Sequence, residues 1–211
     1  MVAKLGIQLH GKNVWCLADG KDSEFTKVFA REFANLGLKK LTCTSFVKDS
    51  HGLALIKDSA ESDFKEIQLE GDGDYNSAEV QKLAEDCDVV ITNPPFSDMN
   101  TTLRYLSFRG CDYCVIAPFY AISELVRFSD LKIPRLYRLK TTEFFVPNPQ
   151  EYSNAKPYSL DPSRGVSIAI SVAMWATTLD LGPIPTLKFN ETPLAELRKQ
   201  GKIDTYKSYP E

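Results

Sequence analysis

Apolar runs alternate with helical patterns along the first half of the chain. An apolar run over residues 13–18 is followed by the polar turn 19–22 and then by apolar residues spaced three or four apart up to Phe33. This pattern predicts a strand, a turn and a helix, with Ser23 as the helix N-cap. Gly37 ends the helix, and residues 41–46 form the next strand. Together these segments predict a βαβ unit.

The same kind of alternation continues as far as residue 117. The further expected elements are two short strands at 52–56 and 64–69 that form a hairpin or lie at an edge, a turn at 71–75, a helix at 77–85, a strand at 88–92, a helix at 99–108 and a strand at 113–117. Strands alternating with helices predict an α/β fold with a mostly parallel sheet and helices on both faces.

The pattern changes after residue 117. Residues 134–146 alternate between apolar and basic, residues 147–164 are polar and rich in proline, and residues 166–178 are a long β-prone run. We expect this run to return to the sheet as an antiparallel strand. Residues 1–182 would then form one domain, and residues 183–211 would be a C-terminal tail that wraps the surface or is partly disordered.

Composition fits a soluble globular protein, with 43% hydrophobic and 25% charged residues among 211. No apolar stretch is long enough to span a bilayer, and the start of the chain lacks the apolar core of a signal peptide. A cytoplasmic protein without a membrane partner is therefore expected. The five cysteines mostly lie in apolar runs, which indicates reduced core thiols. Cys111 and Cys114 have the spacing of a metal or redox pair, but no second pair exists and both histidines are isolated, so we expect no metal site.

A basic segment stands out against the net charge of −3. Between residues 127 and 140 the only acidic residue is Asp130. The basic residues are Arg127, Lys132, Arg135, Arg138 and Lys140, and Arg164 follows further along the chain. Such a segment is a candidate surface for nucleic-acid phosphates. An ordinary solvated edge explains the same charges equally well.

The residues with the most specific chemistry are Asn93-Pro94-Pro95-Phe96, which follow the apolar run 89–91. They would form a rigid loop at the carboxyl end of a buried strand, where open α/β sheets bind ligands. The Asn93 side-chain oxygen and the Pro94 carbonyl can both accept hydrogen bonds from an –NH2 group, and Phe96 offers a stacking face. The alternative is a proline-rich turn that only closes the strand.

Several segments, read in order, carry a family resemblance. They are Val14-Trp15-Cys16-Leu17-Ala18-Asp19, Gly71-Asp72-Gly73-Asp74-Tyr75, Thr92-Asn93-Pro94-Pro95-Phe96-Ser97, Glu143-Phe144-Phe145-Val146-Pro147 and Trp175-Ala176-Thr177-Thr178-Leu179-Asp180. This succession, from about residue 12 to 180, resembles the EcoRI-type adenine-specific DNA methyltransferases. The resemblance implies a Rossmann-like class I methyltransferase fold and S-adenosylmethionine as the cofactor.

The resemblance also implies roles for individual residues. The segment after the first strand would line the cofactor pocket through Leu17, Ala18, Asp19, Ser23 and Phe25. In the second motif Asp72, Asp74 and Tyr75 would lie against the adenine ring of the cofactor, with Asp74 accepting from the ring amine. The alternative for this motif is a tight turn whose acids bond only the backbone.

The chain departs from the wider methyltransferase pattern at three places. Asp19-Gly20-Lys21-Asp22 replaces a glycine-rich first turn, and Thr44-Ser45-Phe46 stands where a carboxylate would close the second strand. Only a dozen residues precede the first strand. We therefore expect the family's amino-terminal segment to be missing or shortened and cofactor affinity to be affected.

The resemblance implies methylation of the exocyclic N6 amine of adenine in DNA. A base inside a duplex cannot reach the proline loop, so the target would be flipped out and stacked on Phe96. Target recognition would fall to a small insertion at 127–165, a second copy of the chain or a partner subunit. Alternatives are an enzyme that methylates guanine in RNA or a protein glutamine, and a non-catalytic methyltransferase-like interaction or DNA-binding protein. A nicotinamide-dependent oxidoreductase is disfavoured because no Gly-x-Gly-x-x-Gly follows the first strand.

Overall fold

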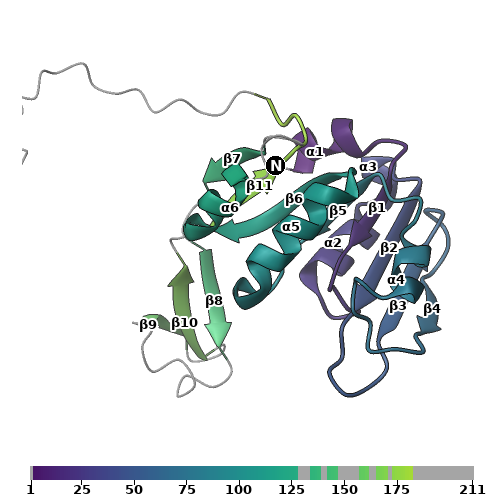
Figure 1. Ribbon diagram of the computed structural model, residues 1–211, viewed down its shortest axis with the longest axis horizontal. Helices are drawn as coiled ribbons and strands as arrows, with labels where there is room; N and C mark the ends of the chain where they lie inside the picture. Colours follow the sequence, from purple (N-terminus) through teal and green to yellow (C-terminus); the bar gives the residue numbers. More distant parts are fainter. Residues whose placement is uncertain are drawn as a thin grey trace, which may run out of the picture.

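The centre of the molecule is an eight-stranded sheet in the order β4-β3-β2-β1-β5-β6-β11-β7, shown in Figure 1. The computed structural model describes residues 2–127, 134–138, 142–146, 157–161, 165–170 and 173–182. The strands of this sheet are β1 (Asn13–Cys16), β2 (Lys40–Ser45), β3 (Leu53–Lys57), β4 (Lys65–Gln68), β5 (Val89–Thr92), β6 (Asp112–Pro118), β7 (Arg135–Arg138) and β11 (Ala173–Thr177). The helices are α1 (Val2–Leu9), α2 (Glu24–Arg31), α3 (Phe33–Leu36), α4 (Ala78–Leu83), α5 (Met99–Arg109) and α6 (Ile122–Arg127), with 3₁₀ turns η1 (Phe96–Asp98) and η2 (Phe119–Ala121).

The middle of the sheet is parallel and its two sides are antiparallel. Strands β2, β1, β5 and β6 run in one direction, because β1 pairs in parallel with β2 and β5, and β5 with β6. The β3–β4 hairpin adds antiparallel strands on one side, and β11 lies antiparallel between β6 and β7 on the other. The predicted α/β fold, its edge hairpin and its antiparallel C-terminal strand are thus confirmed.

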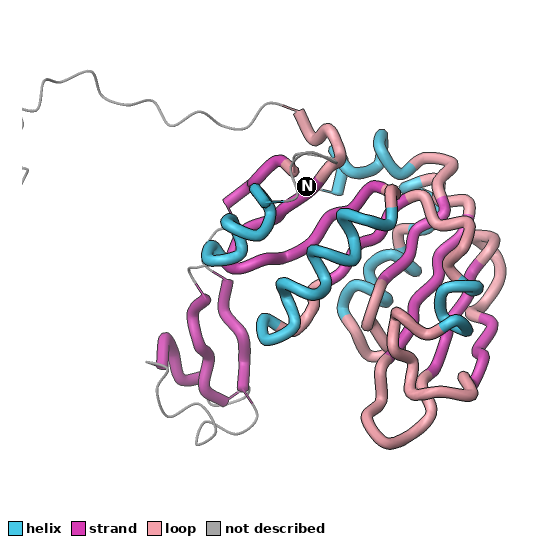
Figure 2. The backbone as a smooth tube through the Cα atoms, viewed as in Figure 1, coloured by secondary structure: helices cyan, strands magenta, loops and turns pink. Residues whose placement is uncertain are grey.

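Helices cover both faces of the sheet (Figures 1 and 2). Side chains that alternate along β1 divide the core into two clusters. Trp15 belongs to one cluster, together with Val80 of α4 and Leu103 of α5. Val14 and Cys16 point into the other cluster, which includes buried side chains of α1, α2 and α3. Alternation along a strand sends neighbouring side chains to opposite faces, so both faces of β1 are apolar because both are covered.

Local signals place the helix ends. The Ser23 hydroxyl accepts a hydrogen bond from the Phe25 amide at 3.1 Å and caps α2, as the sequence predicts. Gly37 adopts a left-handed conformation at the end of α3, which is the stop expected from its position. The expected single helix is broken at Glu32 into α2 and α3. Ser77 caps α4 in the same manner as Ser23 caps α2.

The long β-prone run at 166–178 does not join the sheet as a whole. Its second part forms β11, which pairs with β6 and β7. Its first part lies in β10 (Gly165–Ile170), which pairs with β8 (Thr142–Val146) and β9 (Pro157–Asp161) in a separate three-stranded antiparallel sheet. Figure 1 draws this small sheet apart from the main one, on the side toward which β6 points. The expectation that the whole run returns to one sheet is therefore wrong.

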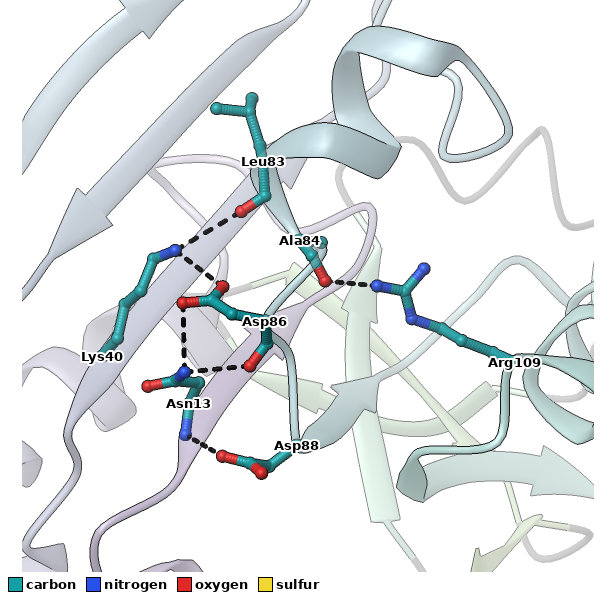
Figure 3. Close-up of polar contacts among 7 residues, drawn as sticks. All are labelled: Asn13, Lys40, Leu83, Ala84, Asp86, Asp88 and Arg109. Atoms are coloured by element: carbon teal, nitrogen blue, oxygen red, sulfur yellow. Dashed lines mark hydrogen bonds and ion pairs between the residues drawn. The ribbon is translucent and has the colours of Figure 1, made fainter.

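Polar contacts at the amino end of β1 fix the connection between α4 and β5 (Figure 3). The Asn13 amide donates to Asp88 at 2.8 Å, and the Asn13 side chain donates to the Asp86 carbonyl at 2.9 Å. Lys40 at the start of β2 donates to the Asp86 carboxylate at 2.9 Å. These contacts align the amino ends of β2, β1 and β5. The more irregular loops lie at the opposite, carboxyl edge of the sheet.

Candidate active site

A cavity of about 410 Å³ opens at the carboxyl edge of the parallel strands. It lies beside the end of β1, where the strand order reverses between β2 on one side and β5 on the other. Open α/β sheets bind their ligands at such a reversal. The lining residues come from the segments after β1, β2 and β5, from the turn before α4 and from the first turn of α5. They are Leu17, Ala18, Phe46, Gly73, Asp74, Tyr75, Asn76, Pro94, Pro95, Ser97, Asp98, Thr101 and Thr102.

The wall formed by residues 71–76 is held against β2 and β3 by two glycines. A Cβ on Gly73 would lie 2.0 Å from the Ser45 carbonyl oxygen, and one on Gly52 would lie 2.6 Å from the same atom. The Val47 amide also donates to the Asp72 carbonyl at 2.8 Å. Only glycine permits this close backbone approach, and Gly73 has a φ of +87°.

The Gly-Asp-Gly-Asp segment is a tight turn, and part of it also lines the cavity. Oδ1 of Asp72 accepts from the Asp74 amide at 3.0 Å, and Oδ1 of Asp74 accepts from the Asn76 amide at 2.8 Å, as expected of acids that stabilise a turn. Asp74 and Tyr75 nevertheless line the cavity, whereas Asp72 does not. The Tyr75 ring packs on Tyr105 with centroids 4.8 Å apart, and its hydroxyl donates to Asp98 at 3.3 Å. Partial burial raises the Tyr75 pKa.

The proline loop follows β5 directly and presents Asn93 to solvent. The buried Thr92 hydroxyl donates to the Leu17 carbonyl and joins the ends of β5 and β1. Asn93 is exposed, and within the described part of the chain its side chain has no hydrogen-bond partner. Pro94 and Pro95 line the cavity, whereas Phe96 does not line it and packs half-buried against the core. The Tyr120 hydroxyl donates to the Phe96 carbonyl at 2.8 Å and ties the loop to η2.

Asp19 is a buried carboxyl group at the carboxyl end of β1. Its side chain accepts from the Ser23 hydroxyl at 2.5 Å, but its Oδ2 atom is buried without a partner in the described structure. Burial raises the pKa of Asp19 to about 6, and the bond from Ser23 offsets part of that shift. The preceding residue, Ala18, lies in the left-handed region at a φ of 60°. Asp19 lies next to the cavity wall without forming part of it.

Two residues proposed for the cofactor pocket lie away from the cavity. Ser23 caps α2, and Phe25 packs in the core with its ring 6.2 Å from that of Phe29 and 6.0 Å from that of Trp175. Leu17, Ala18, Asp74, Tyr75, Pro94 and Pro95 are the proposed site residues that the structure brings together.

The proposed nucleic-acid contacts are only partly within the described residues. Arg127 is exposed near Glu124, and Arg135 is exposed on the edge strand β7 in an ion pair with Asp180. Arg138 ends β7, and nothing is described of its side chain. Lys132, Lys140 and Arg164 lie outside the described residues.

Neither a metal-binding group nor a membrane-spanning helix is found among the described residues. Among the residues that the structure describes, no group of His, Cys, Asp or Glu side chains is arranged to hold a metal ion. Within the same residues, each helix is too short or too polar to cross a bilayer.

Sequence reasoning missed three residues that shape this site: Phe46, Asp98 and Tyr120. Phe46 is 53% exposed at the end of β2 and lines the cavity. Its position was recognisable, because it stands where a carboxylate was expected to close the second strand. Asp98 and Tyr120 carried no sequence signal, since their contacts depend on how η1 and η2 fold back on the cavity.

Nearly the whole chain, residues 3–209, matches the family model described as adenine-specific methyltransferase EcoRI. The chain is 28% identical over 192 residues to the Type II methyltransferase M.EcoRI of Escherichia coli, covering 81% of this chain and 59% of that protein. It is 37% identical over 107 residues to M.MpnI of Mycoplasma pneumoniae, covering 50% of this chain and 33% of that protein. It is 29% identical over 178 residues to M.MgeORF184P of Mycoplasma genitalium, covering 82% and 56%.

The chain spans less than two thirds of the length of each of these relatives. No solved structure matches it. The family match covers both motifs that meet at the cavity, the Gly-Asp-Gly-Asp turn and the proline loop. The chain belongs to the adenine-specific methyltransferase EcoRI family.

Proposed function

We propose that this chain transfers a methyl group from S-adenosylmethionine to the N6 amine of adenine in DNA. One observation carries the proposal: an acidic, aromatic-walled cavity lies directly beside an exposed Asn93 on a rigid proline loop. The cavity offers carboxylates and aromatic rings to a cationic cofactor with a planar adenine. The loop offers hydrogen-bond acceptors to a planar amine. Family membership supports the same assignment.

The charge of the cavity favours this cofactor. Its lining includes the carboxylates of Asp74 and Asp98, and no lysine or arginine is found among the described residues that line it. S-adenosylmethionine carries a sulfonium, an ammonium and one carboxylate, so it is a net cation. The rings of Phe46 and Tyr75 and the two prolines offer apolar surface for its adenine. A dinucleotide would bring its phosphates against two carboxylates, which disfavours the oxidoreductase alternative.

The proline loop would position the target amine. The cofactor supplies an activated methyl group when bound, so no protein nucleophile is required. The Asn93 side-chain oxygen and the Pro94 carbonyl accept the two hydrogens of the –NH2 group and direct its lone pair toward the cavity. The amine proton leaves after transfer, because the methylated ammonium is strongly acidic.

The target base would have to leave the helix, because the loop lies at the edge of a sheet and cannot reach a paired base. Phe96 is half-buried, so any stacking contact would use the part of its ring that remains accessible. Guanine in RNA and a glutamine side chain also present planar –NH2 groups. Adenine in DNA is preferred here because the matching family is adenine-specific and the relatives are Type II methyltransferases.

Replacing Asn93 with alanine tests the catalytic role. We expect methyl transfer to DNA to fall by roughly 10²–10³ or more, because an acceptor in the transition state is removed. The free energy of unfolding should change by less than about 0.5 kcal/mol, since the side chain is exposed. Asn100→Ala, another exposed asparagine on the nearby α5, is the matched control and should retain wild-type transfer.

The experiment uses labelled S-adenosylmethionine with pools of DNA, RNA and protein, and it includes calorimetric titration of the cofactor. Label in N6-methyladenine of DNA supports the proposal. Label in RNA or protein would support one of the alternative substrates. Failure to bind the cofactor would favour a non-catalytic methyltransferase-like protein. Transfer at the wild-type rate by Asn93→Ala would refute the role of the loop.

A further inference from the structure

A second, wider cavity of about 1010 Å³ lies at the opposite, amino edge of the sheet. The proposed methyl transfer does not use it. Its wall includes two half-buried cysteines, Cys87 and Cys111, and the guanidinium-bearing Arg109. Both residues therefore line a cavity that opens to solvent.

The two cysteines lie side by side although they are far apart in sequence. Cys87 comes shortly before β5, and Cys111 immediately precedes β6. These strands are neighbours, with Val89 paired to Asp112 and the Asp112 amide bonded to the Asp88 carbonyl at 3.0 Å. Because Val89 faces Asp112, Cys87 and Cys111 lie beside each other at the amino ends of these strands, and both line the same cavity.

Arg109 gives this pair a cationic neighbour. Its guanidinium lies over the Trp15 ring at 5.0 Å and donates to the Gln81 side chain at 2.6 Å. The neighbouring Cys87 and, against the effect of burial, the charge of Arg109 lower the pKa of Cys111 to about 7, while the neighbouring Cys111 and burial raise the pKa of Cys87. A thiolate is the reactive form of cysteine, so Cys111 is the nucleophile of the pair.

The remaining cysteines serve as an internal comparison. Cys16 and Cys43 face each other in register on β1 and β2. Both are fully buried, however, and the neighbouring Cys43 together with burial raises the pKa of Cys16. Cys114 is buried as well, and burial raises its pKa to about 12. Both pairs therefore lie on neighbouring strands, but a position in the cavity wall and a nearby cation distinguish Cys87 and Cys111.

We propose that Cys87 and Cys111 form an oxidisable dithiol site that hydrogen peroxide converts to a disulfide. The Cys111 thiolate attacks one peroxide oxygen and the O–O bond breaks, which gives a sulfenic acid on Cys111 and, after protonation, one water. The sulfur of Cys87 then attacks the Cys111 sulfur, the S–O bond breaks, and the hydroxyl leaves as a second water with the proton of Cys87. Two thiols lose one electron each, and the peroxide takes up both.

The test treats the full chain with hydrogen peroxide, blocks the remaining thiols with a maleimide and maps the peptides by mass spectrometry. Trypsin cleaves after Lys82, Arg104, Arg109 and Arg127, so Cys87 lies in its own peptide while Cys111 and Cys114 share one. Fragment ions must therefore separate Cys111 from Cys114. We expect a crosslink between Cys87 and Cys111, lighter by two hydrogens, with Cys16, Cys43 and Cys114 still reduced.

Two variants separate the steps. In Cys87→Ser, the sulfenic acid on Cys111 should persist and be trapped by dimedone, whereas Cys111→Ser should leave Cys87 as a free thiol. Both readouts are independent of methyl transfer, so they stand even if the proposed function fails. The proposal is overturned if circular dichroism shows a folded protein in which Cys87 and Cys111 stay reduced. It is equally overturned if Cys16 and Cys43 oxidise at the same rate.

Discussion

At the scale of the residue, Asp19 carries an unusual electrostatic cost. The residue is 7% exposed, one of its carboxylate oxygens has no partner among the described residues, and burial raises its pKa to about 6. The ionised group is therefore less favourable in the folded protein than in the unfolded chain. By the pKa shift, this cost is roughly 3 kcal/mol above pH 6. Such a cost is tolerated where a site has another use for the charge, and Asp19 adjoins the cavity.

The pH dependence of stability follows from the direction of this shift. Between about pH 4 and pH 6 the folded protein holds a proton that the unfolded chain has released, so this group lowers stability as the pH rises. We expect wild-type protein to gain about 1 kcal/mol at pH 5 relative to pH 7 from Asp19 alone. In Asp19→Asn, the free energy of unfolding measured with urea should therefore differ between pH 5 and pH 7 by about 1 kcal/mol less than it does in the wild type. Asp22→Asn, an exposed acid of the same turn, should keep the wild-type difference; equal effects would contradict the assignment.

Single residues also show how far local sequence signals reach. The N-cap role of Ser23 was predictable because a cap depends on the next two or three residues alone. The position of Phe25 was not, because its ring packs against Trp175, 150 residues away. Local pattern identified both as important and could not separate a packing role from a binding role.

At the scale of the element, the loop at 71–76 depends on close packing of backbone against backbone. Gly73→Ala would force a Cβ to within 2.0 Å of the Ser45 carbonyl at a positive φ. Gly11 also has a positive φ, of +70°, but an added Cβ would meet nothing within 4 Å. Gly11→Ala should therefore cost only the backbone strain, about 1–2 kcal/mol. Gly73→Ala should cost about 1–3 kcal/mol more from overpacking.

Urea unfolding of the two alanine variants measures this difference, and calorimetry reports the cavity. Cofactor affinity should fall in Gly73→Ala, because that residue lines the cavity, and should be unchanged in Gly11→Ala. Equal stability of the two variants would mean that the Ser45 backbone can shift at little cost. The loop at 71–76 would then not be held by close packing against Ser45.

The proline loop has its own support in Tyr120, whose hydroxyl donates to the Phe96 carbonyl. Tyr120→Phe removes this bond and leaves the ring. We expect kcat to fall by roughly tenfold with unchanged cofactor affinity, because misplacement of the reacting groups is costly. Tyr137→Phe loses a similar bond, from its hydroxyl to the Gly182 carbonyl, away from the loop, and is the matched control. Single-turnover kinetics distinguish these outcomes, and equal loss in both variants would indicate a general structural effect.

Most elements up to β6 were predictable, because each is specified by its own apolar pattern and turn residues. The run at 166–178 was misjudged because alternation predicts a strand without saying which sheet it joins. Helix α1 was missed although Leu5 and Leu9 are buried one turn apart, since eight residues containing Gly6 give a weak signal. At the site, the proline loop was recognisable, whereas the contacts of Asp98 and Tyr120 arise only from tertiary folding.

At the scale of the whole molecule, the small sheet β8-β10-β9 is an insertion between two paired strands of the main sheet. Arg138 at the end of β7 pairs with Met174 of β11, in an antiparallel ladder. The chain therefore leaves the main sheet after residue 138 and returns directly opposite. A tight turn can join strands in this arrangement, and Asn-Gly is the preferred sequence for a two-residue hairpin loop. The main sheet can then be retained without the insertion.

Replacing residues 140–172 with Asn-Gly tests whether the insertion recognises DNA. The main sheet and its cavity come from other segments, so we expect cooperative unfolding and cofactor affinity within about threefold of wild type. DNA binding and methyl transfer should be lost, because Asn93 and the cavity would lack a surface to hold the duplex. Calorimetry and filter binding measure the two affinities separately. Retained DNA affinity would place recognition elsewhere, with exposed Arg127, which this variant keeps, as the first residue to replace next.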